Sequence, residues 1–459
     1  MTRKLAHFCS WELPPPERED TAPNLPFMLQ DSWDWPEGIA SYEAPEETIV
    51  RNGRYALKMA EGNLNGNIEF VGSCLGSAGA SFTSALGGVI YYYVPFAFNG
   101  VNGLTGNTGD VYVFAKFTNM WDHSDFSNKY FTLGVHVTGY SGGGAATTYM
   151  VELGEFSGST YTSLAKSTNI SVGTTWHTAI VGLKHATHQA KVWVDGGSPK
   201  IDLTPSGTFD KVNAYLPWNE FVKEGDDKDP GGDQGAQLYA DDWAIFHVSS
   251  STIGDELPGV GFKGFLYQPN ADVAGSVEWA GSDYDTPVAY RNVDRIANDC
   301  SPIADATLTP AASEKTYHEY ADEGGANPNA AIRLCWEEGI QTASTHTPKA
   351  TADGSTPAAF GEGGGTVIPG GHYNNPSQTY AWYGLHDHLT PENAAWNVTK
   401  FNAFEGGLES AASGDGSTQA IGELYLLAYG NLITQPDDTP CPPTSLVIPR
   451  PRMAHLIGR

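Results

Sequence analysis

The stretch GGVIYYYVPFAF (residues 87–98) decides the fold, because it is a run of aromatic and β-branched residues introduced by glycine. Similar runs follow it, each bounded by Gly, Asn, Ser or Asp, as strands joined by turns require. Seven or more such strands in one region predict a β-sandwich or a barrel. The later runs are DVYVFAKF (110–117), YFTLGVHVTGY (130–140), TTYMVELGEF (147–156), TTWHTAIVGLKH (174–185), QAKVWVDGG (189–197) and LYADDWAIFHV (238–248).

The composition extends this interpretation to the whole chain. Gly (53 residues), Pro (29 residues) and an aromatic content of 12% supply the turn formers and strand formers of an all-β protein. A chain of 459 residues is too long for one ordinary hydrophobic core. We therefore expect two β-sandwich domains with extended N- and C-terminal arms.

Shifts in composition predict the domain boundaries. The sequence TIVRNGRYALKM (48–59) predicts two short strands around an Asn52-Gly53 turn. The small polar residues and the Pro and Gly of SSSTIGDELPG (249–259) are typical of a linker. The predicted parts are an extended Pro/Trp-rich segment (1–47), a first sandwich (48–250), a second sandwich (251–433) with an exposed Gly/Pro-rich insertion (350–378), and an extended basic tail (434–459).

Charge and hydropathy exclude several functions. The formal net charge of −28 repels phosphate backbones, so neither nucleic acid nor an anionic membrane is an expected partner. No run approaches the length of a membrane span, and the first twenty residues lack the apolar core of a secretory signal. We expect a protein made in the host cytoplasm. A surface rich in Gly, Thr and Tyr without a signal would suit a virion released by lysis.

Four motifs of the first sandwich resemble those of laminin G-like or concanavalin A-like jelly rolls. There a Trp-His pair opens one strand and a hairpin with Asp-Gly at its turn follows. The corresponding segments here are TWH (175–177) and KVWVDG (191–196). YADDWAI (239–245) resembles the closing strand of such domains, and RNGRYAL (51–57) resembles the opening hairpin. The resemblance implies that the first sandwich is a jelly roll.

The second region is similar to a domain of tailed-bacteriophage virion structural proteins, where it often follows a laminin G-like domain. The matching segments are GDELPG (254–259), YQPNAD (267–272), WAGSDY (279–284) and YRNVD (290–294). The resemblance implies two jelly-roll-type sandwiches on the exterior of a virion. It favours a tail or fibre component that adheres to host glycans, and a capsid decoration or head-fibre protein without a ligand is the alternative. A bacterial carbohydrate-binding protein or glycoside hydrolase is a further alternative.

Glycoside hydrolysis would need two carboxylates that flank the scissile bond. The nearest candidates are Glu152 and Glu155, but the usual central Asp is missing and the spacing is wrong. The strand pattern also places Glu152 outward, between Val151 and Leu153. We therefore expect a protein that is not an enzyme.

An acidic loop is the candidate cation site. Asp226, Asp227, Asp229 and Asp233 gather hard oxygen ligands in a Gly-rich segment, as calcium requires. Laminin G-like domains often bind calcium at a loop rim, so the resemblance favours the same ion here. A solvated acidic loop without a metal is the preferred interpretation of this segment, and a calcium site is the alternative.

Aromatic side chains are the candidate glycan ligands, because sugars stack their apolar faces on Trp and Tyr. Trp121 and the cluster Tyr380, Trp382 and Tyr383 are the candidates. The alternative is that these rings pack in a core, as most aromatic residues of sandwiches do.

The C-terminal tail is the candidate assembly arm. Arg450, Arg452 and Arg459 follow the last acidic residue, Asp438, in a Pro-punctuated segment. An extended arm of this kind could add to a sheet edge of a neighbouring subunit by β-augmentation. The expected partners are other virion proteins, tail or capsid subunits, and further copies of this chain.

Overall fold

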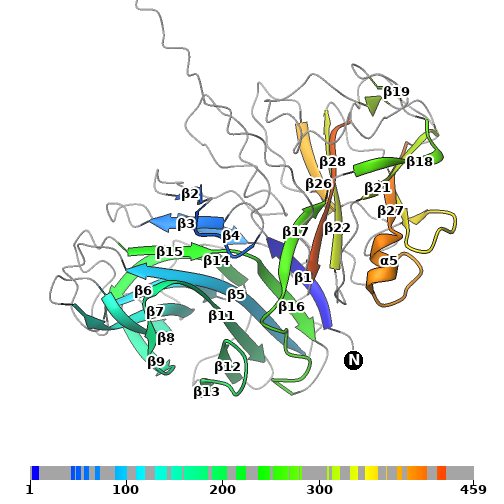
Figure 1. The fold of residues 1–459 in the computed structure, drawn as a ribbon. Coiled ribbons are helices and arrows are strands. Elements are labelled where there is room, and N and C mark those ends of the chain that lie inside the picture. Colours follow the sequence, from blue (N-terminus) through cyan, green and yellow to red (C-terminus); the bar gives the residue numbers. More distant parts are fainter. Residues whose placement is uncertain are drawn as a thin grey trace, which may run out of the picture.

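The computed structural model of the chain is an all-β protein with two pairs of antiparallel sheets (Figure 1). This confirms the fold class expected from composition. Among the described residues the single helix is the short α5 (Val398–Asn402). The structure describes residues 3–9, 43–46, 48–52, 56–60, 68–72, 88–100, 110–118, 130–141, 146–157, 160–184, 189–203, 213–223, 236–248, 252–267, 269–278, 280–281, 308–309, 313–320, 331–339, 347–359, 368–369, 380–384, 390–410 and 421–430.

Sheet A is built around the long strand β5 (Val89–Gly100), which corresponds to the Tyr-rich run GGVIYYYVPFAF of residues 87–98. Its neighbours run antiparallel to it on both sides. Across the sheet the order is β13 (Ile201–Leu203), β12 (Gln189–Val194), β11 (Gly173–Lys184), β5 (Val89–Gly100), β15 (Ala236–Ala240), β3 (Ala56–Ala60) and β2 (Glu43–Glu46), with β16 (Trp243–Val248) beside β5 and β1 (Arg3–Cys9) beside β16.

Sheet B lies opposite sheet A, and the first hydrophobic core fills the space between them. On β5, Tyr92, Val94 and Phe96 face this core, and Leu133 and Val151 face it from sheet B. The order is β10 (Ile170–Ser171), β8 (Ala146–Ser157), β7 (Tyr130–Tyr140), β6 (Asp110–Thr118), β14 (Asn213–Lys223) and β4 (Ile68–Gly72), with β9 (Thr160–Lys166) beside β8.

Along one edge, β5 pairs with two successive strands, β15 and β16, because the chain is interrupted between them. β15 pairs with its C-terminal half and β16 with its N-terminal half. The interruption falls at Asp241 and Asp242, and Asp242 has a left-handed backbone (φ 51°). Pro95, which has no N–H, lies in β5 beside this break, and its carbonyl accepts a bond of 2.8 Å from the Trp243 indole.

Two expectations about the first sandwich were wrong. The predicted pair of strands around a tight Asn52-Gly53 turn is not formed, because β3 pairs with β2 and the connection between them spans residues 47–55. In that connection Arg51 and Asn52 bond to Asp241 and Asp242. Nor is the described part of the predicted linker a free connection. Residues 252–262, here called the strap, bury Ile253 and Phe262 against the outer face of sheet A.

The N-terminal segment is extended where it is described, as predicted, but its strands belong to sheet A. β1 pairs with β16 from Arg3 to Cys9, and β2 pairs with β3. The basic N-terminal residues Arg3 and Lys4 thus pair within their own chain. The first sandwich therefore includes residues from both sides of the predicted boundary at position 47.

The second part of the chain also forms two antiparallel sheets. Sheet C has the order β19 (Ala280–Gly281), β20 (Leu308–Thr309), β28 (Ile421–Gly430), β22 (Ala331–Gly339), β26 (Tyr380–Gly384) and β25 (Ile368–Pro369), with β17 (Lys263–Tyr267) beside β28. Sheet D has the order β18 (Pro269–Val277), β21 (Lys315–Tyr320), β27 (Glu405–Glu409), β23 (Thr347–Thr351) and β24 (Ala358–Ala359).

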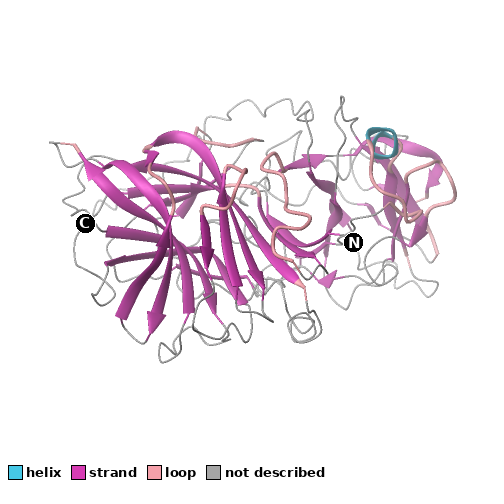
Figure 2. Ribbon diagram, turned by 90° about the horizontal axis from the view of Figure 1, so that it is seen from below, coloured by secondary structure: helices cyan, strands magenta, loops and turns pink. Residues whose placement is uncertain are grey.

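A chain of aromatic contacts around α5 links these sheets. Tyr267 of sheet C contacts Phe401 of the helix at 5.1 Å between ring centroids. Trp396 contacts both Phe401 and Phe404, and Phe404 contacts Tyr320 of sheet D. Figure 2 shows α5 at the end of the molecule away from sheets A and B.

The predicted insertion at 350–378 is not a loop at its start. Residues 347–359 form the hairpin of β23 and β24 in sheet D, and Ile368–Pro369 is β25 of sheet C. The sequence hides the hairpin because its buried residues are small or polar. Thr351 is fully buried, and its hydroxyl donates to Glu392 at 3.1 Å. The rest of the predicted insertion lies outside the described residues.

Candidate functional site

Most residues predicted to bind ligands lie outside the described residues. These are Trp121, the acidic residues Asp226, Asp227, Asp229 and Asp233, and the tail residues Arg450, Arg452 and Arg459. Tyr380, Trp382 and Tyr383 lie on β26, paired with β22, but the structure describes the strand and not these side chains. The calcium, glycan and assembly assignments therefore stay predictions.

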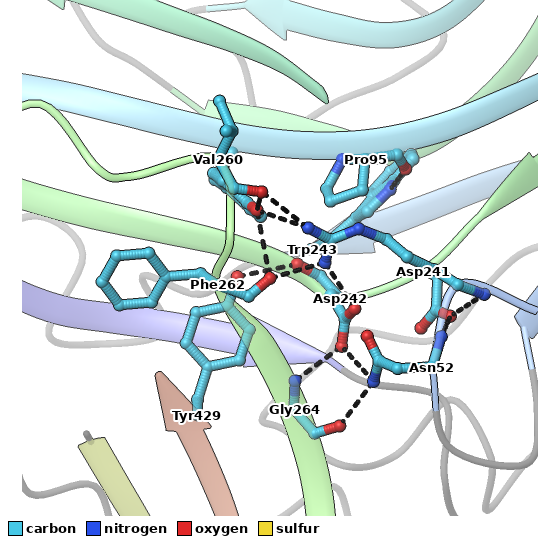
Figure 3. A network of polar contacts seen from close by, with 11 residues as sticks. Asn52, Pro95, Asp241, Asp242, Trp243, Val260, Phe262, Gly264 and Tyr429 are labelled. Atoms are coloured by element: carbon cyan, nitrogen blue, oxygen red, sulfur yellow. Dashed lines mark hydrogen bonds and ion pairs between the residues drawn. The ribbon is translucent and has the colours of Figure 1, made fainter. Parts of the chain in front are cut away.

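The structure instead brings together the motifs that resemble a laminin G-like domain. Arg51, from the opening motif, forms an ion pair of 2.6 Å with Asp242 of the closing motif. Its backbone N–H donates to Asp241 at 3.0 Å, and the Asn52 amide donates to Asp242 at 3.3 Å. The two motifs are separated by 191 positions in the chain. We call this set of contacts the junction (Figure 3).

The junction also binds the strap and the second pair of sheets. The Arg51 guanidinium donates to the Val260 carbonyl at 2.8 Å and to the Phe262 carbonyl at 2.5 Å. The Gly264 N–H, at the start of β17, donates to Asp242 at 2.6 Å. Tyr429 of β28 donates to the Asp242 carbonyl at 2.8 Å. The same aspartate thus accepts bonds from both parts of the protein.

Burial raises the pKa of Asp242, against the opposing effects of the Arg51 charge and the bond from the Gly264 N–H. The Asp242 side chain is completely buried, and 9% of the Arg51 side chain is exposed. Burial alone would lower the pKa of Arg51, but the adjacent Asp242 charge holds it above its ordinary value. Burial also raises the pKa of Tyr93, whose hydroxyl accepts a bond from Arg51, to about 12. A buried carboxylate of this kind requires its partners in order to stay charged.

A second hydrophobic cluster surrounds the junction on the outer face of sheet A. Phe262 of the strap stacks on Tyr429 with ring centroids 5.7 Å apart, and both contact Phe246. Its buried members are Val89, Tyr91, Tyr93, Ile180, Trp193, Ala244, Phe246, Val248, Ile253, Phe262 and Tyr429. Sheet A therefore packs on both faces, against sheet B on one and against the strap and β28 on the other.

The remaining pair of resembling motifs also meets. His177 of the Trp-His dipeptide lies 2.7 Å from Asp195 of the VWVDG segment. Asp195 has a left-handed backbone (φ 55°), and its carboxylate accepts a bond of 2.9 Å from the Thr178 N–H. The pair fixes the start of β11 to the end of β12. The contacts of His177 and Asp195 explain this motif as a feature of local structure.

Glu152 is the chemically most unusual residue of sheet B. Its carboxylate accepts a bond of 2.5 Å from the Tyr161 hydroxyl and lies 2.7 Å from His136 Nδ1 and 3.6 Å from Lys166 Nζ. The predicted outward direction holds, since Val151 and Leu153 face the core, but Glu152 is completely buried rather than solvated. Partners on β7 and β9, remote in sequence, compensate its burial.

Glu152 and Glu155 are not placed as a hydrolytic pair. β8 keeps a regular register with β7 from Tyr149 to Phe156, so residues three apart lie on opposite faces of the sheet. Glu155 therefore lies on the face of Val151 and Leu153, away from Glu152. Two carboxylates on opposite faces cannot flank one glycosidic bond.

No group of three or more metal-ligating side chains occurs in the described ranges.

Comparison with known proteins finds the all-β architecture in several solved structures. One is the carbohydrate-binding module CBM66 from Bacillus subtilis, which is 12% identical, with 47% of this chain and 96% of that chain covered and a TM-score of 0.27. The CBM2 module of the evolved Dit of Lactobacillus casei BL23 phage J-1 is 12% identical, with 55% of this chain and 98% of that chain covered and a TM-score of 0.26. An endo-1,3-beta-glucanase from Streptomyces sioyaensis is 12% identical, with 54% of this chain and 97% of that chain covered and a TM-score of 0.33. No protein family and no curated protein matches the sequence.

One feature of the sequence indicates the junction, although it lies inside a run that otherwise reads as an ordinary strand. Asp241-Asp242 interrupts the otherwise apolar run LYADDWAIFHV, and buried acids in such a run need cationic partners. Arg51 is such a partner, yet nothing local connects positions so distant.

No helix of the described chain is long and apolar enough to cross a membrane.

Proposed function

We propose that the protein is a structural component of the exterior of a tailed-bacteriophage particle, associated with its tail or fibres, and that its jelly roll binds glycans of the host surface. The observation that best supports this proposal is the junction. It fixes the first sandwich on the second through buried bonds from Arg51, Asp242, Gly264 and Tyr429. A protein repeated over a particle surface needs this constant geometry, because each copy has to present its binding face alike.

The adhesive part of the proposal rests on the resemblance of the first sandwich to laminin G-like and concanavalin A-like domains. The assembly part rests on the basic, Pro-rich tail with Arg450, Arg452 and Arg459, which complements a body of net charge −28. A tail from one subunit that docks on the acidic surface of another would join the two by charge and by added strand pairing.

The first experiment measures glycan binding by the purified full chain on an array, with and without calcium, and its mass in solution. Saturable binding that chelation abolishes would support an adhesin with a calcium site at Asp226–Asp233. Binding that survives chelation would support an adhesin without the metal. A well-folded protein that binds neither the array nor host cells would overturn the adhesive role and favour a capsid decoration protein.

A further inference from the structure

We propose that Asn52 is a deamidation site and that its conversion to aspartate or isoaspartate loosens the junction. The reaction needs no bound ligand, because the backbone nitrogen of Gly53 is the nucleophile that attacks the side-chain carbonyl carbon of Asn52. A cyclic succinimide forms, ammonia leaves with the proton of the Gly53 N–H, and one water molecule then opens the ring. Glycine favours the attack, since it has no side chain to hinder the approach.

The Asn52 side chain acts in the junction as a hydrogen-bond donor. Its amide group donates to Asp242 Oδ1 at 3.3 Å and to the Gly264 carbonyl at 2.9 Å (Figure 3). Its Oδ1 is buried and has no donor within the described part of the chain. The surroundings of this side chain therefore fit a donor and do not fit a second acceptor.

Aspartate at this position would have the wrong charge. A carboxylate only accepts, so it would oppose both the Asp242 carboxylate and the Gly264 carbonyl. The Asp242 side chain has no exposed surface, and the interior strengthens the repulsion between like charges. The Arg51 guanidinium already donates to four acceptors, which leaves it little capacity to compensate a second carboxylate.

Isoaspartate would also change the main chain, because it routes the backbone through the former side chain and adds one carbon atom to it. The N–H groups of Arg51 and Asn52 point to Asp241, at 3.0 Å and 3.5 Å. Further along the chain, Ala56 is fixed by its pairing with Glu46 in sheet A. The added atom has to be accommodated between these two fixed points.

The closed junction restrains the reaction that would damage it. Ring closure requires rotation of the Asn52 side chain toward the next backbone nitrogen, and two hydrogen bonds hold its amide group elsewhere. Opening of the junction releases this group, so conversion follows local opening. Because the released ammonia diffuses away, the change is one-way. The coupling between the two sandwiches should therefore weaken with the age of the protein. This inference does not depend on the proposed function.

The first test incubates the full chain at neutral pH, folded and in concentrated urea, and follows deamidation by peptide mass spectrometry. Three further Asn-Gly dipeptides, at Asn65, Asn99 and Asn102, are internal controls for reactivity in urea. We expect conversion of Asn52 at least about tenfold more slowly in the folded chain than in urea, because it then requires local opening. Equal rates in the two conditions would refute the restraint. No conversion at Asn52 in urea, where the other three convert, would refute the chemistry.

A second arm opens the junction by mutation. Tyr429→Phe removes the bond of 2.8 Å to the Asp242 carbonyl, and Asn52 should convert faster in this folded variant than in wild type. Tyr317→Phe is the matched control, since it removes a bond of 3.2 Å to Glu409 on sheet D. Equal acceleration by both variants would show that the junction does not control the reaction. If Tyr429→Phe does not fold, the comparison of folded and urea-treated wild type still decides.

A third arm tests the effect of the product on stability. Asn52→Asp should lower the melting temperature of the full chain, because it places a second carboxylate beside Asp242. Asn99→Asp is the control, since it makes the same change at a half-buried Asn-Gly position on β5. Equal melting temperatures of the two variants would mean that deamidation leaves the junction intact, which would overturn the proposal.

Discussion

Arg51 and Asp242 form a buried ion pair of 2.6 Å that joins the first described loop of the jelly roll to its closing strand. The same carboxylate accepts the Gly264 N–H at the start of the second pair of sheets. Because Asp242 is completely buried, its charge depends on these donors. The pair therefore couples the stability of one sandwich to the placement of the other.

Replacement of Arg51 by Met is expected to lower the free energy of unfolding by about 3–5 kcal/mol, because it leaves an unpaired charge in the interior. Urea denaturation followed by tryptophan fluorescence measures the loss. Lys191→Met is the control, since its exposed pair with Asp202 should contribute below about 1 kcal/mol. Equal losses in the two variants would mean that the junction pair has no special role.

Truncation after Val248 is expected to produce a jelly roll that binds hydrophobic dyes and aggregates. The cut removes the strap and β28, and it exposes Tyr91, Trp193 and Phe246 on the outer face of sheet A. A fragment that ends after Phe262 keeps the strap and should aggregate less. A monodisperse fragment 1–248 without dye binding would show that the cluster around the junction is dispensable.

His318 should make the second sandwich less stable in mild acid. It is completely buried between Asp272 (3.0 Å from Nδ1) and Thr316 (2.8 Å from Nε2), and burial lowers its pKa below the ordinary 6.5. The unfolded chain therefore binds a proton near pH 6.5 that the folded protein takes up only at lower pH. Stability should fall as the pH drops below about 6.5 and be constant above it.

The measurement is the free energy of unfolding from pH 7.5 to pH 5, compared with His318→Asn. The variant cannot titrate at this position, so its stability should depend less on pH over this window. It will be less stable than wild type at every pH because it loses one of its hydrogen bonds, so only the slopes are compared. Identical slopes would show that His318 does not control the acid response.

Deletion of residues 447–459 is expected to preserve the fold and abolish incorporation into particles. The deleted segment contains Arg450, Arg452 and Arg459 and no acid, and it follows the last strand of sheet C by more than fifteen residues. Circular dichroism and melting temperature test the fold, and the protein content of purified particles tests incorporation. Assembly at wild-type stoichiometry would refute the docking arm.

The strands of the first sandwich could be predicted because each is encoded locally. The seven quoted runs from GGVIYYYVPFAF to LYADDWAIFHV all contain strands. Tyr91 and Tyr93, however, face a second hydrophobic cluster rather than solvent, and no local pattern distinguishes a covered sheet face from the core face. The alternation gave the direction of each side chain and not what covers it.

The errors have one physical cause, which is competition from distant partners. The Asn52-Gly53 dipeptide strongly favours a tight hairpin, yet the bonds of Arg51 and Asn52 to two aspartates about 190 positions away prevail. The strap resembles a linker because only Ile253 and Phe262 in it are large and buried. The surroundings of Glu152 could not be predicted from sequence, since Glu152, Tyr161 and Gly154 meet only through the pairing of β8 with β9.

The concentration of bonds at the junction has a mechanical consequence. A force that pulled the second pair of sheets away from the jelly roll would load the bonds of Arg51, Gly264 and Tyr429 to the Asp242 region together. Bonds loaded in parallel share the applied tension, whereas bonds loaded one after another rupture singly at lower force. The two sandwiches should therefore resist separation under fluid drag and transmit tension from one end of the molecule to the other.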